Sequence, residues 1–150
     1  MAGVSGLGRV FDVVHDASTN YFSMKNASAC SFIVKSSGAA SLAITAEPSF
    51  GGTPANWTTA LGFGQTAFFY QNTTVNGTGA WTRQTATWTT NSVALAGTTG
   101  YTSVFTVYTS QFADTYCYIK AVGTNTTTVI ALLHDLTVQR APANLAILGA

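Results

Sequence analysis

Side chains able to do acid–base or nucleophilic chemistry are few and scattered along this chain of 150 residues. A glycosidase needs two convergent carboxylates, but each of the five acids stands alone in the sequence: Asp12, Asp16, Glu47, Asp114 and Asp135. The adjacent pairs His15–Asp16 and His134–Asp135 would point to opposite faces of a strand, so we expect neither to form a local relay. A Ser-His-Asp triad could still assemble from distant residues.

No nucleophile-elbow sequence and no glycine-rich phosphate loop accompanies these residues. We therefore predict a protein that is not an enzyme and that needs no cofactor. Cys30 and Cys117 have neither redox spacing nor enough histidine companions for zinc, so no metal site is expected. Buried free thiols are the predicted state of both cysteines, although spacing alone leaves open whether they pair.

Aromatic residues are better candidates for binding. In the segment 81–89, alternation puts Trp81 and Arg83 on one face and Trp88 on the other, which predicts an edge or interface strand. Phe69 lies in a second aromatic segment, and aromatic side chains with arginine are typical of interface cores. The alternative is an aromatic contact within one subunit. Trp57 is expected to anchor a crossover loop over residues 47–63, with a sugar-stacking role as the alternative.

The elements that would position these residues read as strands, because two-residue alternation and β-branched runs dominate and no helical period persists. We expect strands at residues 9–15, 21–24, 30–36, 41–47, 66–71, 81–89, 92–96, 103–109, 115–122 and 127–140. The last two should form a hairpin with its turn at residues 123–125. These features predict an all-β fold, a jelly-roll-like antiparallel β-sandwich in preference to a closed barrel.

The chain fits a single domain, residues 1–150, with an extended arm at each end. Residues 1–8 form an apolar N-terminal arm, and residues 141–150 form an apolar tail that contains Leu145, Ile147 and Leu148. Nothing after this tail would cover its side chains. We expect the tail to lie either in a groove of its own domain or against a neighbouring subunit.

Charge is the most unusual feature of the composition. Only 7% of the residues are charged, against roughly a quarter in an ordinary soluble domain, and the formal net charge is +1. The six basic residues are scattered singly, which argues against nucleic acid as a partner. No apolar run approaches the roughly 20 residues that span a bilayer, and the first residues lack a signal-peptide pattern. A surface so neutral suits a protein that works within an assembly.

The threonine-, alanine- and glycine-rich strands, the segment YCYIKAVGTNTTTVIALLHDLTVQRAP and the ending NLAILGA resemble the capsid decoration (cement) and minor capsid proteins of tailed bacteriophages. The resemblance implies a non-enzymatic, often trimeric structural protein on the capsid surface of the virion, made in the host cytoplasm. Its partner would be the major capsid protein or another virion protein. Two alternatives stay open: a carbohydrate-binding module or virion-surface adhesin, and a tail-tube or neck subunit.

Overall fold

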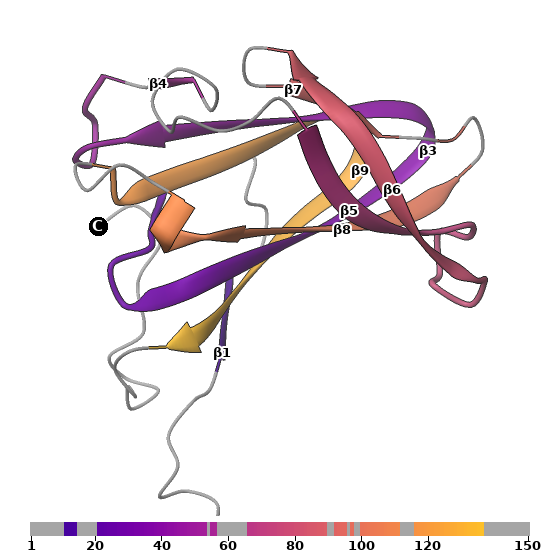
Figure 1. Ribbon diagram of the computed structural model, residues 1–150, viewed down its shortest axis with the longest axis horizontal. Coiled ribbons are helices and arrows are strands. Elements are labelled where there is room, and N and C mark those ends of the chain that lie inside the picture. The colour runs from indigo at the N-terminus through magenta and orange to yellow at the C-terminus, as the bar shows by residue number, and fades with distance from the viewer. Residues whose placement is uncertain are drawn as a thin grey trace, which may run out of the picture.

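The computed structural model describes residues 11–14, 21–53, 55–56, 66–89, 92–95, 97, 100–111 and 116–136. Every structural statement below concerns these residues. They form nine strands and one short 3-10 helix (Figure 1): β1 (Phe11–Val14), β2 (Phe22–Ser23), β3 (Ala27–Glu47), β4 (Ala55–Asn56), β5 (Thr66–Asn72), β6 (Trp81–Thr89), β7 (Ser92–Leu95), β8 (Tyr101–Tyr108), η2 (Thr109–Gln111) and β9 (Tyr118–Leu136). The predicted all-β class is confirmed. The described part of the chain has no helix long and apolar enough to span a membrane.

The strands pair as one antiparallel sheet that closes on itself. β8 and β7 both pair with β3, and β5 and β6 join them, so the ring runs β3-β7-β6-β5-β8 and back to β3. β9 lies along β3 outside this ring, with β1 and β2 paired to β9 and β4 paired to β3. The predicted two-sheet jelly-roll sandwich is therefore replaced by a five-stranded closed barrel with additional strands.

Closure depends on the bend of one long strand. β3 pairs with β8 through residues 29–36 and with β7 through residues 40–43, so its two halves contact two different strands of the ring. Between these halves the pairing with β9 shifts register: Ser36 faces Thr126 and Ser41 faces Thr124. Such a bulge bends a strand and increases its twist. The strands predicted at residues 30–36 and 41–47 are therefore two parts of one strand, with the bulge between them.

β9 bends beside β3, as the two long ribbons of Figure 1 show. The predicted hairpin over residues 115–140 is wrong, because Tyr118–Leu136 is one strand paired with β3 on both sides of the bend. Its residue at the bend, Asn125, has a positive φ of 56°, and its side-chain amide donates a hydrogen bond to the Ala39 carbonyl at 3.2 Å. The asparagine-containing segment that predicted a turn therefore supplies a kink inside a strand.

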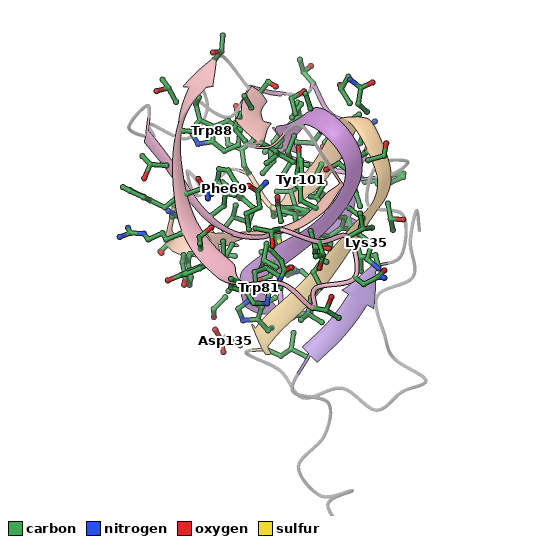
Figure 2. All side chains as sticks on the ribbon, turned by 90° about the vertical axis from the view of Figure 1, so that its right-hand side faces the viewer. Lys35, Phe69, Trp81, Trp88, Tyr101 and Asp135 are labelled. Carbon is green, nitrogen blue, oxygen red and sulfur yellow. The ribbon has the colours of Figure 1, made fainter. Side chains whose placement is uncertain are left out.

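The barrel interior is aromatic and aliphatic. Trp88 packs edge-on against Phe105, with ring centroids 5.4 Å apart, and Phe69 lies 6.3 Å from the same ring. Edge-to-face and tilted aromatic pairs of this kind favour the native packing beyond the apolar area they bury. Figure 2 shows Phe69, Trp88 and Tyr101 within the ring of strands. Inward side chains alternate with outward ones along β3, where Phe32 and Val34 are fully buried and Ile33 and Lys35 are half-buried.

Candidate functional site

The outer wall of β5 and β6 carries a group of exposed aromatic side chains, which we call the aromatic face: Phe68, Tyr70, Trp81 and Arg83. The three rings are each about half exposed, at 50%, 56% and 47% in that order. Antiparallel pairing sets Tyr70 opposite Arg83 and Asn72 opposite Trp81. Side chains directly or diagonally opposite on one sheet face are within contact range. The strand register thus gathers these residues into one surface.

Arg83 is the charged group of the aromatic face. Its guanidinium carbon lies 4.3 Å from the centroid of the Phe68 ring, a cation–π contact. Among the described residues no acid pairs with Arg83. An arginine guanidinium carries five N–H donors, so Arg83 adds hydrogen-bonding capacity to the aromatic face.

The connection between β5 and β6, residues 73–80, holds the base of the aromatic face. The side chain of Asn72 is fully buried beneath this connection. Its amide donates to the carbonyls of Gly77 and Gly79 at 3.1 and 2.6 Å, and its carbonyl accepts from the amides of Thr74 and Gly79 at 3.0 Å each. Thr102 of β8 donates to the Val75 carbonyl at 2.7 Å. This network fixes the turn that leads directly into Trp81.

Asn72 is a structural residue of the candidate site that the sequence analysis did not single out. The signal lay in the run NTTVNGTG, because asparagine side chains commonly bond their own backbone a few residues on. Sequence patterns showed a turn there but did not show that one side chain bonds both ends of it.

A row of aliphatic side chains extends the aromatic face across the barrel wall. Cross-strand register places Tyr70 opposite Val104 of β8, Val104 opposite Ile33 of β3, and Ile33 opposite Ile130 of β9. The three aliphatic residues are half-buried. The outer wall therefore presents a continuous row of aromatic and aliphatic side chains from β5 to β9, with Arg83 of β6 at its end.

Two of the predicted interface residues are not on this surface. Phe69 and Trp88 are 2% and 5% exposed and belong to the core. Side chains along a strand alternate between its two faces. Phe68 and Phe69 are adjacent and Trp81 and Trp88 are seven positions apart, so the two members of each pair lie on opposite faces. Phe69 and Trp88 are placed for aromatic contacts within one subunit, which was the alternative to an interface. Trp81 and Arg83 are exposed, as an interface would require.

β6 has the edge character that its sequence predicted over part of its length. It pairs with β5 from Trp81 to Thr87 but with β7 only through Trp88 and Thr89. The other candidates lie outside the described residues: Trp57, Leu145, Ile147 and Leu148, with the two terminal arms at residues 1–8 and 141–150.

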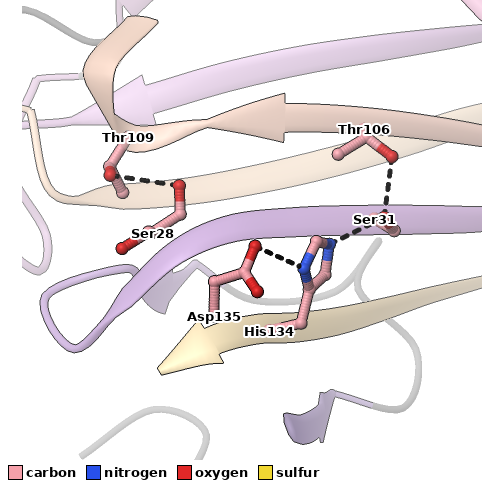
Figure 3. Close-up of polar contacts among 6 residues, drawn as sticks. All are labelled: Ser28, Ser31, Thr106, Thr109, His134 and Asp135. Atoms are coloured by element: carbon pink, nitrogen blue, oxygen red, sulfur yellow. Dashed lines mark hydrogen bonds and ion pairs between the residues drawn. The ribbon is translucent and has the colours of Figure 1, made fainter. Parts of the chain in front are cut away.

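A second group, which we call the serine–histidine chain, lies on the outer wall formed by β3, β8 and β9 (Figure 3). Ser31 Oγ is 2.7 Å from Thr106 Oγ1 and 3.0 Å from His134 Nε2. His134 Nδ1 is 3.2 Å from Asp135 Oδ2. The expectation that His134 and Asp135 point to opposite faces is wrong. Asp135 has a positive φ of 53°, which breaks the alternation and brings its carboxylate to the imidazole.

Both cysteines are free. Cys30 is fully buried, as predicted, and burial raises the pKa of its thiol far above the ordinary value of 9.0. Cys117 is only half-buried, and its thiol contacts the Pro48 carbonyl at 3.4 Å. Burial therefore disfavours the thiolate of Cys30, which is the nucleophilic form of a cysteine.

The chain matches no protein-family model, no curated protein and no solved structure.

Proposed function

We propose that this protein is a non-enzymatic structural protein of a bacteriophage virion, which decorates and stabilises the capsid. The observation that supports this best is the row of aromatic and aliphatic side chains that runs from Trp81 and Tyr70 across Val104 and Ile33 to Ile130. Exposed aromatic groups beside half-buried aliphatic ones are typical of surfaces that bury against a protein partner.

The neutrality of the chain favours this function on physical grounds. Removing charged groups from water on association is expensive unless each one is paired, whereas rings, methyls and hydroxyls lose much less on desolvation. With only 7% charged residues the protein has few such groups to desolvate over a wide contact. A homo-oligomer, such as a trimer, would multiply modest contacts with the major capsid protein or another virion protein into high avidity.

Sedimentation with empty capsids of a candidate phage tests the proposal. We expect the purified protein to travel with the shells in fixed stoichiometry and to raise their thermal stability. Trp81→Ala should weaken this association by about tenfold or more, since truncation of an aromatic anchor removes roughly 2 kcal/mol of binding. Phe50→Ala is the matched control, because Phe50 is also about half exposed but lies in the turn after β3, away from the aromatic face.

Failure of the wild-type protein to bind any shell would overturn the proposal. If Trp81→Ala and Phe50→Ala weakened capsid binding equally, the aromatic face would not be the binding surface. Light scattering adds a further discrimination, because a ring-sized mass would indicate a tail-tube or neck subunit, and a small compact oligomer agrees with decoration.

Carbohydrate binding is the second candidate, and one observation favours it. Tyr70 and Trp81 expose half of their surface next to the guanidinium of Arg83, which carries several N–H donors. Stacking rings beside a few polar groups are what a saccharide-binding surface requires. A glycan array separates the two functions: saccharide binding that Tyr70→Ala and Trp81→Ala both abolish would establish the module or adhesin, and an architectural protein should bind none.

A further inference from the structure

The serine–histidine chain carries an inference that goes beyond the architectural function. We propose that Ser31 is a nucleophile that accepts an acyl group from small activated esters, with His134 as its general base and Asp135 as a positioning residue. The order of contacts, Ser31 Oγ to His134 Nε2 at 3.0 Å and His134 Nδ1 to Asp135 Oδ2 at 3.2 Å, is the arrangement that activates a serine hydroxyl.

The directions of these hydrogen bonds follow from the chemistry of the groups. An ionised carboxylate only accepts, so the proton of a neutral imidazole lies on Nδ1 and is donated to Asp135. Nε2 is then an acceptor, and the Ser31 hydroxyl donates to it. Because this uses the one proton of Ser31, Thr106 must donate to Ser31 Oγ across their 2.7 Å contact. The hydrogen bonds therefore run from Thr106 through Ser31 to His134. In this direction His134 is the group that can accept the Ser31 proton.

Ser31 is partly exposed on the outer wall. Ser31 is half-buried, and the imidazole and carboxylate are 28% and 69% exposed. Its neighbours along and across the strands, Ile33 and Leu132, are half-buried aliphatic side chains. A small acyl group can therefore reach Oγ, with apolar surface on two sides to contact it.

Ser31 Oγ forms a bond to the carbonyl carbon of the ester while its proton moves to His134 Nε2. The bond from that carbon to the leaving oxygen or sulfur breaks, and the leaving group departs with the electron pair as a phenolate or thiolate. The products are an ester of Ser31, the released leaving group and an imidazolium that returns its proton to solvent.

The backbone around Ser31 restricts the substrate class. Ser31 pairs with Thr106 on one side and Leu132 on the other, so its amide N–H faces a neighbouring strand and is not directed at a carbonyl above the wall. Without backbone donors for the developing oxyanion, about 10²–10³ in rate is lost. Only esters with good leaving groups, such as aryl esters and thioesters, should react. Hydrolysis of the acyl-serine is slowed for the same reason, so Ser31 becomes a modification site and not a centre of turnover.

Labelling with p-nitrophenyl acetate tests the proposal. We expect one stoichiometric release of p-nitrophenolate, a mass gain of one acetyl group, and peptide mapping of that group to Ser31. Ser31→Ala should abolish the labelling. Ser28→Ala is the matched control and should leave it unchanged, because Ser28 lies on the same strand and contacts Thr109 through its backbone carbonyl, which accepts from the Thr109 hydroxyl at 3.2 Å (Figure 3).

Variants of the other two groups separate chemistry from structure. His134→Gln should slow acetylation by roughly 10²-fold, the usual contribution of a general base. Asp135→Asn should slow it roughly tenfold or more, and nitrogen-15 NMR should show the His134 proton leaving Nδ1, a change that a merely structural role would not produce. Thermal melting of each variant checks that it folds.

Three results would overturn the proposal: acetylation of Ser31→Ala at the wild-type rate, which would make the imidazole itself the nucleophile; acetylation spread evenly over the serines; or a folded His134→Gln variant that reacts like the wild type.

Discussion

The two walls of the β5–β6 pair contain the same kinds of residue and use them in opposite ways. On the inner wall Phe69 and Trp88 are almost wholly buried and contact Phe105. On the outer wall Phe68 and Trp81 are about half exposed, and Phe68 contacts the guanidinium of Arg83. Residue type therefore does not decide whether an aromatic side chain stabilises the fold or is available to a partner. Its position in the two-residue alternation does.

Truncation of the two tryptophans of β6 should show the largest difference between the two walls. Trp88→Ala should lower the free energy of unfolding by about 3–5 kcal/mol, because it removes a buried ring and leaves a cavity against Phe105. Trp81→Ala should change it by roughly 0.5 kcal/mol or less, since surface substitutions have small effects. Denaturant titration measures both, and similar losses in the two variants would show that the walls do not differ as described.

Asn72 lies on the outer side of β5 with Phe68 and Tyr70. Unlike them it is buried, because residues 73–80 cover it. Asn72→Asp retains an acceptor but replaces the donor to two glycine carbonyls with a charged oxygen. We expect a loss of about 2–3 kcal/mol in the free energy of unfolding, the penalty for unpaired buried polar groups. Thr73→Ala, an exposed change one residue on, is the control and should be nearly neutral. Equal melting temperatures for the two variants would contradict the role of Asn72.

The enclosure of Cys30 in the core can be tested by changing the pH. Its folded thiol stays neutral because burial raises its pKa, whereas the unfolded thiol ionises above 9.0. Ionisation therefore favours the unfolded chain as the pH rises past that value, and stability attributable to Cys30 is present below it and lost above it. Relative to Cys30→Ala, the wild-type free energy of unfolding should fall by about 1.4 kcal/mol for each pH unit above 9.0. A difference that stays constant with pH would show that Cys30 is not enclosed.

Arg83 gives the smallest expected effect on folding. Arg83→Gln removes the cation–π contact with Phe68, which at an exposed site is worth about 0.5–1 kcal/mol. Arg83→Lys retains the charge and should recover part of that free energy. Both variants are compared with the wild type by thermal melting. A loss as large as that of Trp88→Ala would mean that the outer wall is part of the stabilising core.

Local pattern was sufficient for several elements. β6 has the predicted limits of residues 81–89, and β5 and β7 agree with their predicted segments within one residue. The two faces of β6 also follow the predicted alternation, because the period of two is a property of extended backbone itself. What alternation cannot supply is which face is inside, since that depends on the strands that lie over it. Trp88 became a core residue because β3 and β8 close the ring around it.

Amino-acid sequence alone determined the all-β class, the neutral surface and the alternation of inward and outward side chains, because each follows from composition or from the geometry of neighbouring residues. Tertiary structure decided the barrel, the continuity of β3 and β9 through their bends, and the contact of His134 with Ser31. These depend on pairings between residues far apart in the chain and on the positive φ at Asn125 and Asp135. A turn signal and a bend within a strand use the same residues, and only the partner strand distinguishes them.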